Sequence, residues 1–171
     1  LFYWILVQWP NLKKRQRIKK NLASQYLIFK TSCIENFLAV ADDRILSSSP
    51  SELLSVAKFR KHFNEGVGDN RNRWHEVHNN MSDYYLNNTL SRMEVLRLEI
   101  LLAMQVVDFS DSHAYEVLKR FSNVIVMQRN ASRDYDSIKS FLRIFWEIFA
   151  GWDLAHGYRD TDVIEEFINS I

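Results

Sequence analysis

The chain has few of the residues that form tight turns, and it cannot form an internal disulfide. Its 171 residues include 4 Gly and 2 Pro. β-Sandwiches, barrels and Rossmann-type folds of this length need many more turn glycines, so the scarcity favours a few long helices. The single cysteine, Cys33, excludes the disulfide-rich secreted class and permits a reducing compartment.

Apolar residues are abundant and recur with helical spacing. They make up 47% of the chain, which excludes a disordered protein and suffices for one sizeable core. One stripe repeats every three or four residues through Leu22, Tyr26, Phe29, Cys33, Phe37 and Val40. We predict an all-α fold, a helical bundle of about five to six helices whose first helix is long and continuous with a membrane-exiting segment.

Three local signals refine the helix boundaries. Ser49, Pro50 and Glu52 form a capping-box pattern with proline in the first helical position, which predicts a helix start. The run Asn87-Asn88-Thr89 interrupts a long helical pattern with weak helix formers and predicts a kink or break. Gly151 suits the position just after a helix.

The net charge of +1 hides an uneven distribution. Residues 1–20 contain six basic residues and no acidic one, so the remaining 151 residues carry 16 basic against 21 acidic side chains, a net charge of −5. The basic residues are Lys13, Lys14, Arg15, Arg17, Lys19 and Lys20. The basic character is therefore local, and the rest of the chain is mildly acidic.

The start of the chain has the order apolar, tryptophan, basic. Residues 1–9 as a helix cover about 14 Å, half a bilayer core, so they cannot cross a membrane alone. The order is that of a transmembrane helix leaving the bilayer, with Trp4 and Trp9 among the headgroups and the basic residues against anionic lipid. The positive-inside rule then makes the rest cytoplasmic. We predict that residues 1–10 end a transmembrane or membrane-interface segment and that 11–171 form a single cytosolic helical-bundle domain.

Two alternatives remain for this start. Residues 1–9 could be a buried core helix or strand of a soluble protein, and the basic residues 13–20 could be a nucleic-acid patch. The chain does not begin with Met, so either its start has been processed or it is cut from a longer protein, and this favours the membrane interpretation.

Two clusters could carry chemistry, and each also has an ordinary structural interpretation. His75 and His78 share a helix face, but their spacing of three differs from the spacing of four in zinc proteases, and a polar helix start explains them. Asp153 and His156 could orient a base, although loop hydrogen bonds explain the pair equally well. We therefore predict no enzyme, no metal and no cofactor, with a helical enzyme that has a metal or Asp–His site as the alternative.

An aromatic run near the end of the chain exceeds what one core needs. It comprises Phe141, Phe145, Trp146, Phe149 and Trp152. Most of it is expected in the core, and the excess is a possible partner interface, because aromatic residues are enriched in such surfaces.

These features lead to three functional hypotheses. The first is a membrane-tethered helical interaction or effector module that contacts lipid through its N-terminal segment and acts through a protein partner or a homo-oligomer. The second is the enzyme described above. The third is nucleic-acid binding through residues 13–20, which the acidic body disfavours, so that no direct nucleic-acid contact is expected from it.

The layout resembles that of small membrane-anchored effector subunits of bacterial anti-phage systems, such as the two-transmembrane effectors of some retrons. The apolar residues 1–9, the basic residues 13–20 and a helical body of about 150 residues carry the resemblance. It implies a protein of the bacterial inner membrane that a partner complex restrains and whose release damages that membrane. This is an analogy of arrangement, and no residue role follows from it.

Overall fold

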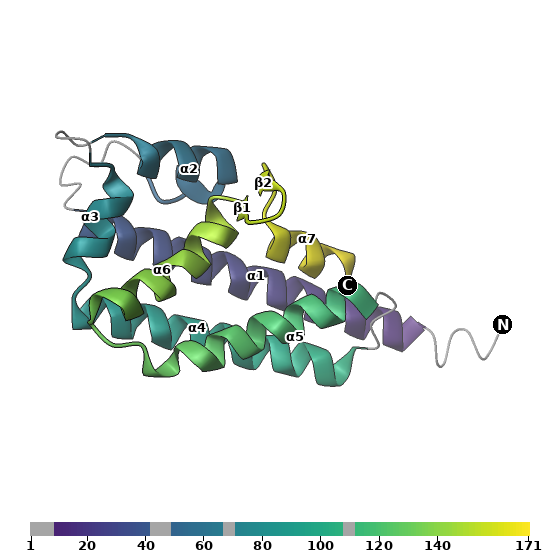
Figure 1. Cartoon of the computed structure of the whole chain (residues 1–171). Coiled ribbons are helices and arrows are strands. Elements are labelled where there is room, and N and C mark those ends of the chain that lie inside the picture. Colours follow the sequence, from purple (N-terminus) through teal and green to yellow (C-terminus); the bar gives the residue numbers. More distant parts are fainter. Residues whose placement is uncertain (1–8, 42–48, 67–70, 108–111) are drawn as a thin grey trace.

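The computed structural model describes residues 9–41, 49–66, 71–107 and 112–171. Within these residues the chain forms seven α-helices and a two-stranded hairpin (Figure 1). The fold is therefore mostly helical as predicted, with more helices than the five to six expected and a hairpin that the sequence analysis did not predict. Trp4 lies outside the described residues, and so does the side chain of Trp9. The helices are α1 (Trp9–Val40), α2 (Val56–Asn64), α3 (Arg73–Asn80), α4 (Asp83–Val106), α5 (Ser112–Met127), α6 (Tyr135–Phe149) and α7 (Val163–Ser170).

Three short elements complete the described structure. Glu52–Leu54 and Gln128–Asn130 are single 3-10 turns. Strands β1 (Trp152–Asp153) and β2 (Gly157–Tyr158) pair antiparallel, with Trp152 opposite Tyr158.

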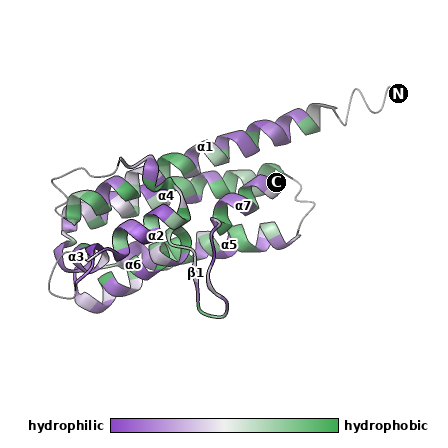
Figure 2. Ribbon diagram, turned by 90° about the horizontal axis from the view of Figure 1, so that it is seen from above, coloured by the Kyte–Doolittle hydropathy of each residue, from purple (hydrophilic) through white to green (hydrophobic). Residues whose placement is uncertain are grey.

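The long helix α1 organises the bundle. It runs beside α4 in the opposite direction, since Asn21 contacts Glu99 while Asn36 contacts Asn88. Helix α7 lies along its N-terminal half, and α3 lies near its other end (Figure 1). Figure 2 shows that the first turns of α1 project beyond the other helices. The predicted long first helix is thus confirmed from Trp9 onward.

The core is rich in phenylalanine. The predicted α1 stripe is buried throughout, with exposed fractions of 4% or less. Phe37 lies at its centre, with ring centroids 5.2 Å from Phe145 and 6.5 Å from Phe63 in edge-on geometry. Such edge-to-face pairs stabilise a core beyond the simple burial of apolar area.

Two predicted boundaries were wrong. The break expected at 87–89 is absent, because α4 continues through it and the chain bends at Met81 and Ser82 instead. The capping box at Ser49 begins a 3-10 turn, and α2 starts only after Ser55, whose backbone is extended. In contrast, Gly151 follows α6 with φ +69°, as the sequence predicts.

None of the helices in the described part of the chain is long and apolar enough to cross a membrane. The membrane-exiting segment predicted for residues 1–10 therefore remains a prediction.

Candidate functional site

The basic residues at the start of α1 divide between two faces of the helix. Arg15 donates through Nε to the backbone carbonyl of Ile171, and Lys19 donates through Nζ to that of Asn169. These carbonyls lie at the C-terminal end of α7, where helical carbonyls lack partners and the helix dipole is negative. These two cations consequently join α1 to α7.

The other basic residues of this segment are on the surface. Lys13, Lys14, Arg17 and Lys20 are all exposed. The spacing of Lys14, Arg17 and Lys20 places them along one side of the helix, and the first acidic residue of α1 is Glu35. We call Lys14, Arg17 and Lys20 the basic face.

The aromatic run 141–152 also divides. Phe141, Phe145 and Phe149 are at most 1% exposed and pack inside the domain, so they offer no surface to a partner. Trp146 and Trp152 are only partly buried. The predicted partner interface is narrowed to these two residues and remains a prediction.

Trp146 and Trp152 line a groove between α3, α6 and the hairpin, with a volume of about 450 Å³. We call it the tryptophan groove; it is lined by Trp74, His78, Lys139, Arg143, Trp146, Trp152 and Leu154. The rings of Trp74 and Trp146 have centroids 5.1 Å apart. The guanidinium carbon of Arg143 lies 5.8 Å from the ring centroid of Trp152, within cation–π range.

The two histidines of α3 have different environments. The Nδ1 atom of His75 lies 2.8 Å from Oδ1 of Asn72, the N-cap residue of the helix. His78 lines the groove, and its Nε2 is buried with no hydrogen-bond partner among the described residues. Burial first, and then the positive charges of His75 and Lys139, lower the pKa of His78 from 6.5 to about 4. His78 is therefore neutral at pH 7.

The Asp153–His156 pair holds the tip of the hairpin. Oδ1 of Asp153 accepts hydrogen bonds from the backbone amides of Ala155 and His156 and lies 3.1 Å from Nδ1 of the His156 ring. The backbone donors come first among the causes that lower the pKa of Asp153. Within the described ranges, no group of three or more His, Cys, Asp and Glu side chains is placed to hold a metal ion.

A buried polar cluster that sequence reasoning missed joins α1 to α7. Nζ of Lys30 lies 2.6 Å from Oδ2 of Asp162, and the Tyr26 hydroxyl donates to the same carboxylate at 2.6 Å. Burial, together with the charge of Asp162, raises the pKa of Tyr26 well above its usual value. Asp162 also caps α7 by accepting from the amides of Ile164 and Glu165. The available signal was the pattern Asp162-x-x-Glu165 before an apolar run, which is typical of a helix start.

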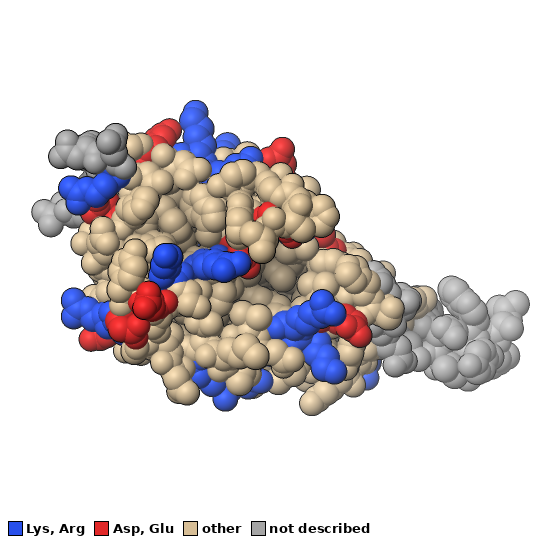
Figure 3. All heavy atoms as spheres, in the orientation of Figure 1, with Lys and Arg blue, Asp and Glu red and all other residues tan. Residues whose placement is uncertain are grey.

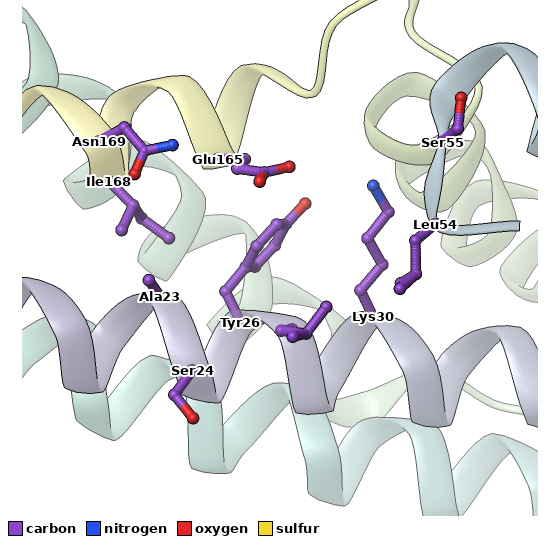
Figure 4. A pocket seen from close by; sticks show the side chains of 10 residues that line it. Ala23, Ser24, Tyr26, Lys30, Leu54, Ser55, Glu165, Ile168 and Asn169 are labelled. Carbon is purple, nitrogen blue, oxygen red and sulfur yellow. The ribbon is translucent and has the colours of Figure 1, made fainter. Parts of the chain in front are cut away.

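A cleft of about 540 Å³ lies beside this cluster. Figure 4 shows Tyr26 and Lys30 rising from α1 towards Glu165 of α7, with Ser55 on the far side of Lys30. Both polar side chains already have partners in Asp162, so the cluster is explained as a link between helices.

No protein-family model, curated protein or solved structure matches this chain.

Proposed function

We propose that this chain is an interaction module held at an anionic membrane surface by the N-terminal part of α1. The observation that carries the proposal is the basic face, three exposed cations along one side of the N-terminal part of α1, whose first turns project beyond the other helices (Figure 2). Its three side chains point away from the contacts that Arg15 and Lys19 make with α7. A row of exposed cations on one side of a helix suits a flat anionic partner.

The energies are sufficient for reversible binding. A Lys or Arg close to an anionic leaflet contributes about 1 kcal/mol. Three such residues therefore strengthen binding by about a hundredfold. The net charge of −5 over residues 21–171 directs the body away from the same surface.

The test is co-sedimentation of the full 171-residue chain with vesicles. We expect binding to vesicles of phosphatidylcholine with phosphatidylserine, weak binding to phosphatidylcholine alone, and release as salt rises. The triple variant Lys14→Glu, Arg17→Glu, Lys20→Glu should lose at least about a hundredfold in binding. Circular dichroism verifies that its helices are retained.

The control variant Lys119→Glu, Arg120→Glu reverses the charge of two exposed cations on α5. This double variant should bind vesicles like the unaltered chain. The proposal would be contradicted if the triple variant and the control bound anionic vesicles equally well. It would also be contradicted if the unaltered chain bound neutral and anionic vesicles equally well. Tighter binding to a DNA duplex than to anionic vesicles would favour the nucleic-acid hypothesis.

We further propose that the protein is an effector of a bacterial defence system that acts at the inner membrane. This extension rests only on the order of the apolar start, the basic residues and the helical body. Such an effector is expected to assemble, since short membrane segments disrupt a bilayer only in groups. Induced expression of the full-length protein in bacteria should then collapse the membrane potential, measured with a voltage-sensitive dye. An unchanged potential, or a strictly monomeric full-length protein in detergent, contradicts this extension.

A further inference from the structure

The tryptophan groove gathers the described tryptophan side chains at one place. Trp74, Trp146 and Trp152 come from α3, α6 and the hairpin, and all three line it. Trp74 is braced from behind by Phe37 and Phe63, with ring centroids 5.3 and 5.5 Å away. Core packing therefore holds the Trp74 part of the floor in place before any ligand arrives, which lowers the entropic cost of binding.

The rim of the groove is cationic. Lys139 and Arg143, four residues apart on α6, are both exposed there, and Figure 3 shows Lys and Arg side chains over α6. Within the described chain, Glu147 is the carboxylate that contacts Arg143, and it accepts from Nε at 2.8 Å. The terminal guanidinium nitrogens remain for a second anion. The cationic rim and the aromatic floor together favour a ligand that has acidic groups next to an apolar group.

Two further features indicate an occupant that is larger than a small molecule. Leu154, at the hairpin end of the groove, is 80% exposed, so it extends the apolar surface beyond the three indoles. A volume of about 450 Å³ holds one large side chain, and the chain around it would cover Leu154.

We propose that the tryptophan groove docks a short acidic segment of a partner protein and buries one bulky aromatic or apolar side chain of that segment between the three indoles. Interface hot spots have this composition, with Trp and Arg around a buried anchor. The inference rests on the proposed function in that an interaction module needs a partner. Helices α3 and α6, which line the groove, lie towards the end of the bundle opposite the N-terminal turns of α1, so partner and membrane can bind together (Figure 1).

Intrinsic fluorescence tests the groove directly. In the Trp4→Phe, Trp9→Phe background, the three remaining tryptophans all line the groove. The probes are an acidic pentapeptide with a central Phe, the same peptide with Ala for Phe, the same peptide with Gln for its acidic residues, and free N-acetylphenylalanine. We expect a saturable change with the first peptide and binding at least about tenfold weaker for each of the others.

Two outcomes would overturn the inference. The absence of a saturable change with the acidic Phe peptide, or equal binding of its Gln counterpart, removes the acidic segment as the ligand. Binding of free N-acetylphenylalanine as tight as that of the peptide reassigns the groove to a small aromatic carboxylate.

A pair of matched variants tests the rim. Arg143→Glu should weaken peptide binding by at least about tenfold. Arg120→Glu is the control, because Arg120 is also exposed and is likewise paired with a glutamate four positions away, Glu116 at 3.5 Å. Equal effects of the two variants would contradict a role for the groove.

The titration contains no lipid, so its result is independent of vesicle binding. The basic-face variant Lys14→Glu, Arg17→Glu, Lys20→Glu should bind the peptide normally. If peptide binding fails while vesicle binding is retained, the groove inference falls alone. If vesicle binding fails while peptide binding is retained, the membrane proposal is overturned and the inference about the groove stands.

Discussion

Lys30 and Asp162, 132 positions apart in the chain, form an ion pair with Nζ and Oδ2 2.6 Å apart, and their side chains are only 3% and 2% exposed. The pair fastens the N-terminal end of α7 to the middle of α1. Two charges removed from water are tolerated because Asp162 receives further hydrogen bonds from Tyr26 and from two backbone amides.

Removing the carboxylate should strongly destabilise the fold. Asp162→Ala leaves Lys30 buried without a counter-charge and removes the cap of α7, so we expect a loss of about 3–5 kcal/mol in the free energy of unfolding, measured with urea. Asp160→Ala is the control, since its side chain is 81% exposed and pairs with Arg60 at the surface. Similar losses for both variants would show that the buried Lys30–Asp162 pair stabilises the fold no more than the exposed Arg60–Asp160 pair does.

A glycine pair separates steric conflict from backbone strain. A Cβ at Gly151 would lie 2.4 Å from the carbonyl oxygen of Arg159, whereas at Gly157, with φ +75°, nothing lies within 4 Å. We expect Gly157→Ala to cost about 1 kcal/mol and Gly151→Ala about 3 kcal/mol or more, from thermal unfolding. Equal shifts in melting temperature would mean that the backbone at Arg159 moves away from the added Cβ at little cost in free energy.

The buried His78 should make stability depend on pH. Its pKa is about 4 in the folded protein against 6.5 ordinarily, so the unfolded chain binds the proton first as pH falls. Stability that is present above pH 6.5 is therefore lost progressively as pH falls towards 4. Urea midpoints should drop more over this interval for the unaltered chain than for His78→Gln. NMR titration of the imidazole should show no protonation at pH 6, and a midpoint near 6.5 would refute the assignment.

The polar contact between α1 and α4 should contribute modestly. Nδ2 of Asn36 donates to Oγ1 of Thr89 at 3.1 Å, and Thr89 is fully buried. Thr89→Val removes the acceptor at nearly constant volume and should cost about 1 kcal/mol in urea unfolding. Ser91→Ala removes only an exposed hydroxyl that bonds within its own helix, and it should change little. A neutral Thr89→Val would show that the link between the helices adds no stability.

Much of the fold was predictable where a local pattern decides it. The stripe from Leu22 to Val40 predicted the buried face of α1, and Gly151 predicted the end of α6. The break at 87–89 was predicted wrongly because Asn88 and Thr89 accept hydrogen bonds from Asn36 of another helix, while the Thr89 hydroxyl donates to the Tyr85 carbonyl within α4. Weak intrinsic propensity was overridden by a tertiary contact.

The candidate sites were predictable only in part. Sequence spacing selects the aromatic run 141–152, but it cannot tell Phe145 in the core from Trp146 on the groove, because adjacent residues of a helix point in different directions that depend on its neighbours. Likewise, the basic cluster is visible in the sequence, while the use of Arg15 and Lys19 at the end of α7 is not.

By itself, the sequence determined an all-helical chain with a long first helix that begins in a basic segment, since helical periodicity and local charge are properties of neighbouring residues. Only the tertiary structure decided which cations stay on the surface, that three tryptophans meet in one groove, and that Lys30 is buried on Asp162. These relationships join residues up to 156 positions apart, and the packing of helices that brings them together has no periodic signature in the chain.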